Sequence, residues 1–127
     1  MNAFLLVGIG GALGAMARYG TSVAVGHFWR ASFPVATLTV NVVGSLLMGL
    51  LVGWLARALP EWQNEARLFV AVGILGGFTT FSAFSLDVVT LFERGEMAPA
   101  LGYVLGSVVL SVAALFIGLL LMRALPA

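Results

Sequence analysis

Residues 76–85 read GGFTTFSAFS, and this stretch decides the fold because it interrupts a long apolar segment. Two adjacent glycines weaken a helix. Four hydroxyl side chains and three phenylalanines share these ten residues, at a depth where lipid offers the hydroxyls no partner and the backbone no water. We therefore predict that a membrane helix is broken between Gly76 and Thr80, and that something other than lipid faces this segment.

The rest of the chain has the composition of an integral membrane protein. It has 127 residues, of which 61% are hydrophobic and 9% charged, with a mean hydropathy of +1.12. Since a spanning helix needs about 20 mostly apolar residues, the sequence predicts an all-α protein with four transmembrane helices at about 2–25, 33–58, 67–91 and 98–121. The predicted connections are 26–32, 59–66 and 92–97, so we expect one four-helix transmembrane domain over residues 1–127.

The basic residues lie near the ends of the predicted spans and are evenly divided between the two sides of the membrane. All six are arginines: 57, 67 and 123 on one side, and 18, 30 and 94 on the other. Orientation follows the Lys and Arg bias of short loops, so this balance predicts insertion in both orientations. Oppositely oriented copies can pair through a two-fold axis, which predicts an antiparallel homodimer. The alternative is a weakly biased single topology.

Several functional classes are disfavoured by composition. The chain has no cysteine, hence no disulfide or thiolate metal site, and its net charge of +1 indicates no nucleic-acid partner. An enzyme is not expected, because there is no carboxylate cluster and His27 is the only histidine. A non-transporting scaffold fits the composition, but it would not need the polar side chains described next.

Two spans each carry three polar side chains at intervals of four residues, which places each set on one helix face. These are Thr37, Asn41 and Ser45 in the second span and Tyr103, Ser107 and Ser111 in the fourth. All six can donate hydrogen bonds and none carries a formal charge, so facing stripes suit a small anion. The alternative is hydrogen bonding between helices, worth about 1 kcal/mol or less per pair. Asn41 is the strongest candidate, since a buried amide is costly unless it is used.

The segment at 76–85 has two chemical interpretations of its own. Phe81 and Phe84 lie near one helix face, where they either pack or turn their electropositive ring edges toward an anion. A break before them frees backbone carbonyls, which in membrane proteins often bind a cation. In oppositely oriented copies two such breaks would meet at the bilayer centre, where a sodium ion would satisfy them.

Glycines four residues apart occur in every span and predict close helix packing. The pairs are Gly10 and Gly14, Gly49 and Gly53, Gly73 and Gly77, and Gly102 and Gly106.

A small multidrug-type proton-coupled cation transporter is the main rival function. Such transporters also have four short spans, but they depend on an intramembrane glutamate, and ionisable groups inside spans are functional by default. This chain has no carboxylate at mid-depth. Asp87, late in the third span, is interpreted as a helix-end charge, a vestibule charge or an arginine partner.

Three motifs resemble those of the CrcB/Fluc fluoride channel family: GALGAMARY at 11–19, TVNVVG at 39–44 and GGFTTFSAF at 76–84. The resemblance extends over the whole chain and implies passive export of cytoplasmic fluoride across the inner membrane, which gives fluoride resistance. It further implies an antiparallel dual-topology homodimer with two pores and a central structural sodium ion.

The resemblance also implies roles for individual residues. Asn41 would donate to fluoride, Phe81 and Phe84 would border the pore, and a polar track would run through Tyr103, Ser107, Ser111 and Thr37. The carbonyls of Gly76 and Thr79 would hold sodium, and Arg18 would lie near a vestibule. Ala83 departs from the threonine that many relatives carry there, so this pore would rely more on its other donors.

Overall fold

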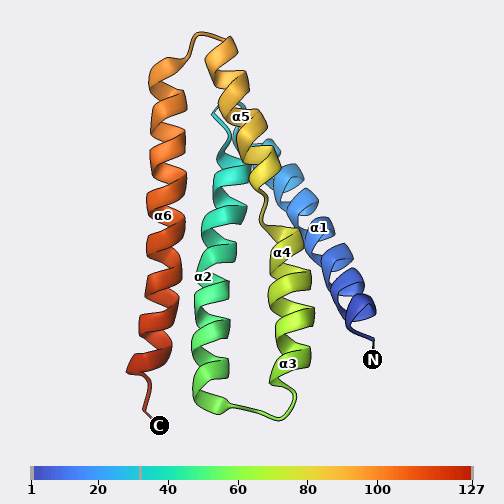
Figure 1. Ribbon diagram of the computed structural model, residues 1–127. Coiled ribbons are helices and arrows are strands. Elements are labelled where there is room, and N and C mark those ends of the chain that lie inside the picture. The colour runs from blue at the N-terminus through green and yellow to red at the C-terminus, as the bar shows by residue number, and fades with distance from the viewer. Residues whose placement is uncertain (1, 32, 127) are drawn as a thin grey trace.

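Four helical segments long and apolar enough to cross a membrane make up the described part of the chain. The computed structural model describes residues 2–31 and 33–126, and these spans are Ala3–Phe28, Val35–Ala58, Gln63–Glu93 and Met97–Ala124. The four predicted spans are confirmed (Figure 1). Helix α1 (Ala3–Phe28) runs three residues past its predicted end, into the connection 26–32, of which Ser32 lies outside the described residues.

The third span is built from four pieces. It begins with α3 (Gln63–Ala66), continues through the π-helical segment η1 (Arg67–Leu75) and α4 (Gly76–Phe78), and resumes as α5 (Phe81–Glu93). Thr79 and Thr80, between α4 and α5, have extended backbone conformations with φ/ψ of −82°/158° and −151°/125°. The predicted break is confirmed.

The break lies on the threonines, whereas both glycines of the motif are helical. Threonine is β-branched and favours extended backbone. The Thr80 hydroxyl also caps the next helix by accepting the backbone N–H of Ala83 at 3.1 Å. Gly76 has helical dihedrals of −62° and −39°. The threonines therefore stop the helix, whereas Gly77 packs against α1, where a Cβ atom added to it would lie 2.6 Å from the Gly11 carbonyl oxygen.

Glycines bring α1 into backbone contact with η1 and α4. A Cβ atom placed at Gly10 would lie 2.3 Å from the Phe69 carbonyl oxygen, and one at Gly14 would lie 2.0 Å from that of Ile74. A side chain at either position would force the helices apart. Figure 1 shows α1 leaning against this part of the third span.

Helix α2 (Val35–Ala58) forms a second such pair with α6 (Met97–Ala124), and the two run side by side in Figure 1. A Cβ atom at Gly49 would lie 2.2 Å from the Leu115 carbonyl oxygen. The predicted packing role thus holds for three of the four glycine pairs. At Gly102 and Gly106 a Cβ atom would meet open space within the described chain.

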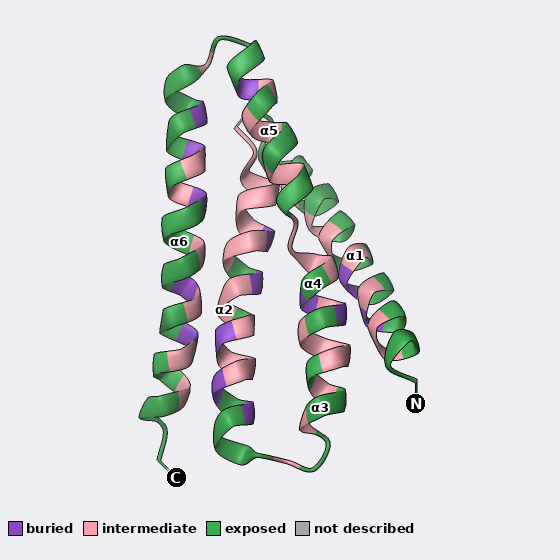
Figure 2. Ribbon diagram, in the orientation of Figure 1, coloured by how far each residue is buried: buried purple, intermediate pink, exposed green. Residues whose placement is uncertain are grey.

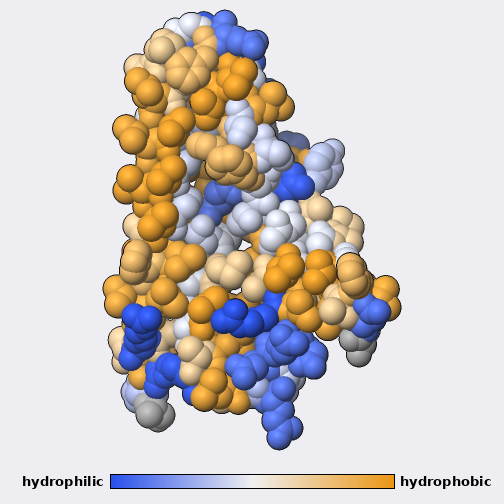
Figure 3. All heavy atoms as spheres, viewed as in Figure 1, coloured by the Kyte–Doolittle hydropathy of each residue, from blue (hydrophilic) through white to orange (hydrophobic). Residues whose placement is uncertain are grey.

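The outer faces of the helices are apolar. Buried residues lie mainly where helices face one another, and the outward residues are exposed (Figure 2). Many exposed residues are large and hydrophobic, and they form the orange surface of Figure 3. A water-soluble protein rarely exposes so much contiguous apolar surface, so these faces are suited to lipid or to other helices.

Candidate functional site

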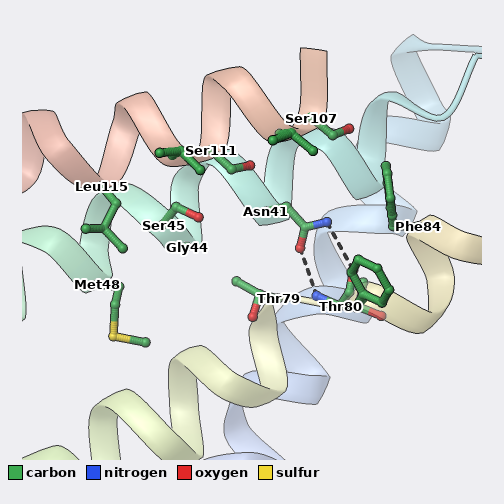
Figure 4. Close-up of a pocket in the computed structure, with 13 residues that line it drawn as sticks. Asn41, Gly44, Ser45, Met48, Thr79, Thr80, Phe84, Ser107, Ser111 and Leu115 are labelled. Carbon is green, nitrogen blue, oxygen red and sulfur yellow. Dashed lines mark hydrogen bonds between the residues drawn. The ribbon is translucent and has the colours of Figure 1, made fainter. Parts of the chain in front are cut away.

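A cavity of about 400 Å³ opens beside the break in the third span, between α2, α6 and α5. Figure 4 shows its lining residues. Its polar and aromatic lining comprises Asn41, Ser45, Thr79, Thr80, Phe81, Phe84, Ser107 and Ser111. Six residues predicted from the sequence to border an anion path are therefore brought together from three separate spans: Asn41, Ser45, Phe81, Phe84, Ser107 and Ser111.

The Asn41 side chain pairs with both backbone groups of Thr80. Its Nδ2 donates to the Thr80 carbonyl oxygen at 3.0 Å, and its Oδ1 accepts the Thr80 backbone N–H at 2.8 Å (Figure 4). Asn41 Oδ1 therefore supplies the acceptor that the Thr80 N–H loses by leaving the helix. Asn41 Nδ2 adds a donor to the Thr80 carbonyl, which lies at the N-cap of α5. Because an asparagine amide carries two N–H donors, one remains for another acceptor at the cavity.

The hydroxyl oxygens of Ser107 and Ser111 are buried and have no hydrogen-bond partner among the described residues. They lie one helical turn apart along α6 and line the same cavity. Elsewhere in the spans, Thr21 and Thr39 donate to carbonyls four residues earlier in their own helices. A buried hydroxyl without a partner is costly, so two neighbouring ones indicate that a ligand or water completes this wall.

The two predicted phenylalanines differ in their surroundings. Phe84 packs its ring 5.1 Å from that of Tyr103, next to a small buried core of Leu91, Ala100 and Tyr103. Phe81 lies 5.5 Å from Phe84 but is 78% exposed. Phe84 is thus part of the fold of one chain, whereas Phe81 borders the cavity with most of its ring uncovered. That either ring turns its edge to an anion remains a prediction.

Tyr103 connects the polar stripe of α6 to a carboxylate. Its hydroxyl donates to Asp87 Oδ2 at 2.9 Å, and the Thr37 side chain also interacts with this hydroxyl. The three interpretations of Asp87 from the sequence did not include a tyrosine partner. Its spacing contained the signal, because Asp87 follows Phe84 by three residues and so shares the face of α5 that meets α6. Asp87 also lines a second cavity of about 120 Å³.

Arg18 lies at the helix break. Its Nε donates to the Gly77 carbonyl oxygen at 3.0 Å, joining residues 59 positions apart. The resemblance placed Arg18 near a vestibule, which remains a prediction. Its contact with the third span was not predicted.

The carbonyls of Gly76 and Thr79 lose their helical partners at the break. In a continuous helix they would accept from Thr80 and Ala83, but those N–H groups donate to Asn41 and to the Thr80 hydroxyl instead. Carbonyl oxygens freed in this way are suitable ligands for a hard cation. The family resemblance implied a sodium site at these same two carbonyls, and that site remains a prediction.

The α2 backbone also approaches the break closely. A Cβ atom at Gly44 would lie 2.3 Å from the Thr79 methyl group, so only glycine fits between them. The Thr79 hydroxyl donates to the Leu75 carbonyl at 2.9 Å and is therefore already engaged with the preceding helix.

Comparison with known proteins relates the chain to one family. The family described as "CrcB-like protein, Camphor Resistance (CrcB)" matches residues 5–119. Proteins named "Fluoride-specific ion channel FluC" from Paracoccus denitrificans, Rhodospirillum centenum and Chelativorans sp. are 53%, 53% and 54% identical over 124, 125 and 125 residues. These matches cover 98%, 97% and 98% of this chain and 97%, 97% and 99% of the relatives. The similarity therefore extends over nearly the full length of both proteins.

Proposed function

The chain belongs to the CrcB-like family, and on that premise we propose that this multi-pass membrane protein conducts fluoride passively out of the cell across the inner membrane. It is an ion channel for fluoride rather than an enzyme. The observation that carries the mechanism is the pair of buried hydroxyls at Ser107 and Ser111, which have no hydrogen-bond partner among the described residues and line a cavity that Asn41 also lines.

Neutral donors suit a conducted anion. Fluoride loses hydration on entering a narrow path, and hydroxyl and amide donors replace part of that shell. No arginine is among the described residues that line the cavity, and neutral donors bind an anion less tightly than a cationic side chain would, which favours the release that conduction requires. The membrane potential then drives the anion outward, and no proton carrier is needed. The rival cation transporter is disfavoured because Asp87, the carboxylate late in the third span, accepts a hydrogen bond from Tyr103.

We propose that the channel is completed by a second, oppositely oriented copy, giving a homodimer with two pores. Phe81 supports this, because it lines the cavity yet is 78% exposed in one chain. A two-fold contact uses the same surface of both copies, so each chain would cover the other's Phe81. The equal division of six arginines between the two predicted sides is consistent with insertion in both orientations.

The same arrangement accommodates a structural sodium ion. Gly76 and Thr79 each offer one carbonyl that has left the helical pattern. A two-fold axis at the break would bring together two of each, four oxygens in all, which is suitable chemistry for a hard cation. Asn41 and Arg18 hold the residues around these carbonyls.

Flux measurement tests the function. Purified protein is reconstituted into liposomes loaded with fluoride, and efflux is followed with a fluoride electrode after valinomycin is added, with no proton gradient. We expect rapid fluoride release and little chloride release. Failure to release fluoride would overturn the proposal, and proton-coupled uptake of a quaternary ammonium dye would favour the rival transporter.

Two further experiments address assembly and sodium. The chain has no cysteine, so single introduced cysteines report crosslinks without background. We expect crosslinks only between positions that meet in antiparallel pairs, and exclusively parallel pairs would refute the assembly.

Replacing sodium by a bulky organic cation on both sides of the membrane is expected to abolish flux, and undiminished flux would contradict the sodium site.

A further inference from the structure

We propose that Arg18 is a positioning residue that holds the broken third span through the Gly77 carbonyl, and that it acts through its hydrogen bond rather than through its charge. The Arg18 Nε lies 3.0 Å from that oxygen, in a partly buried setting. This inference rests on the proposed function, because the carbonyls next to Gly77 are the proposed sodium ligands.

The position of Arg18 follows from the packing of α1. Gly10, Gly14 and Arg18 recur at intervals of four, so they share one face of this helix. The first two bring α1 into backbone contact with η1 and α4. Arg18 is the next residue on this face, and it lies where the first helical part of the third span ends. At this position α1 carries a long side chain instead of a glycine. The two glycines fix the distance over which Arg18 reaches the carbonyl.

The chemistry of the helix end explains the contact. The last carbonyls of a helix have no partner within it, and an arginine side chain near a helix C-terminus can donate hydrogen bonds to them. Arginine donates from a fixed planar group whose Nε lies close to its stem. Lysine has the same charge at the tip of a flexible chain and has no donor at the equivalent position. A lysine at residue 18 would keep the charge and lose this bond.

The bond fixes the direction of the neighbouring carbonyls. Gly77 follows Gly76 directly and precedes Thr79 by two residues, and on the other side of the break Asn41 holds both backbone groups of Thr80. Arg18 on α1 and Asn41 on α2 therefore hold the two sides of the break from different helices. The carbonyls of Gly76 and Thr79 are set in place before any cation binds.

Steering of anions by the Arg18 charge is the competing explanation, and it makes different predictions. Steering requires only a positive charge, and added salt weakens it, because the Debye length falls from about 30 Å at 0.01 M to about 3 Å at 1 M. Positioning requires the Nε donor and is insensitive to salt.

The test compares Arg18→Lys and Arg18→Gln in liposomes at low and high ionic strength, which is set with an organic-cation salt at constant sodium. Matched controls are Arg123→Lys and Arg123→Gln, since Arg123 lies in the last turn of α6 and lines neither cavity. We expect both Arg18 variants to lose at least tenfold in fluoride flux at either ionic strength, with the controls unchanged. Near-normal flux in Arg18→Lys, with a loss in Arg18→Gln that disappears at high salt, would overturn the proposal.

Sodium dependence separates positioning from a general loss of folded protein. In Arg18→Lys we expect the sodium concentration that gives half-maximal flux to rise about tenfold, so that residual flux recovers in part at high sodium. A destabilising change elsewhere would lower the amount of active protein and leave that concentration alone. An unchanged sodium dependence in Arg18→Lys overturns the positioning role.

A direct observation is independent of flux. In bilayer samples of the unaltered protein, solid-state NMR should show a through-space correlation between the Arg18 ¹⁵Nε and the Gly77 carbonyl ¹³C. Its absence in folded protein overturns the proposal even if both Arg18 variants fail to fold. Its presence in protein that releases no fluoride would leave the contact standing and reject the channel function.

Discussion

The two halves of the third span are held in different ways. Before the break, η1 and α4 lie in backbone contact with α1, at distances where a single added carbon would collide with a carbonyl oxygen. After the break, α5 meets α6 through the core around Leu91 and through the bond from Tyr103 to Asp87. Much of its length is uncovered, with Phe81 78% and Leu86 67% exposed. The first half is anchored to its own chain along the face that meets α1, whereas the second presents a wider surface that a second copy or lipid must cover.

The largest expected effect tests the anchored half. Gly14→Ala would place a Cβ atom 2.0 Å from the Ile74 carbonyl oxygen, so the helices must separate, at a cost of about 3 kcal/mol in the free energy of unfolding. Gly8→Ala is the matched control, because a Cβ atom there meets open space and alanine favours the helix by about 1 kcal/mol. Equilibrium unfolding in mixed micelles measures both. Equal stability of the two variants would show that the contact does not anchor the span.

The next largest effect is expected at the break between the two halves, where Asn41 pairs with Thr80. Asn41→Asp replaces the Nδ2 donor with an acceptor facing the Thr80 carbonyl, which we expect to cost about 2 kcal/mol of folding free energy and to abolish fluoride flux. Thr39→Val is the control, since the Thr39 hydroxyl donates within its own helix. Liposome flux and micelle unfolding are measured on the same samples. Normal flux in Asn41→Asp would reassign the residue to packing.

Substitutions in the exposed half should show which residues are needed for folding and which are needed for conduction. We expect Phe84→Ile to destabilise one chain by about 1 kcal/mol, because its ring packs on Tyr103. Phe81→Ile should change the stability of dissociated chains by less than about 0.5 kcal/mol, as for other surface sites, while still abolishing flux. Unfolding in dilute micelles, with flux measured in parallel, distinguishes the two. If Phe81→Ile conducts normally, that ring does not border the pore.

The smallest effect on flux is expected at the cavity wall opposite α5. Ser111→Ala removes a buried hydroxyl that has no partner among the described residues, so unfolding should change by less than about 1 kcal/mol, toward higher stability. Flux should nevertheless fall severalfold. Ser85→Ala is the control, because the Ser85 hydroxyl already donates to the Phe81 carbonyl. A marked loss of stability in Ser111→Ala would mean that its hydroxyl has a structural partner.

Most of the architecture follows from local properties of the sequence. The four spans follow from apolar length, and the shared cavity of Asn41, Ser107 and Ser111 follows from spacing on helix faces. The exact position of the break was harder to predict from the sequence. Gly76 and Gly77 are weak helix formers, yet they remain helical because α1 packs against this end of the helix. Tertiary packing outweighed local propensity there.

Contacts between distant segments could not be deduced from one sequence. The sequence marked Asn41 as a donor to an anion, but its main partner is the Thr80 backbone, 39 residues away. Arg18 and Asp87 likewise find their partners across the bundle. The glycines at 102 and 106 show the reverse case, since their spacing predicted a contact that the described chain does not make. Spacing identifies a face, and only the packed structure shows what that face meets.

The pairing of Asn41 with Thr80 offers a rule for designing membrane channels. One primary amide reproduces the two hydrogen bonds by which a residue's N–H and C=O pair with a neighbouring antiparallel strand, so it acts as a β-bridge contributed by a helix. A designer who needs to end a helix inside the bilayer could therefore place two β-branched residues at the stop and one asparagine opposite them on the next helix. That asparagine would satisfy the second β-branched residue, and the carbonyls before the stop would become available as a binding site.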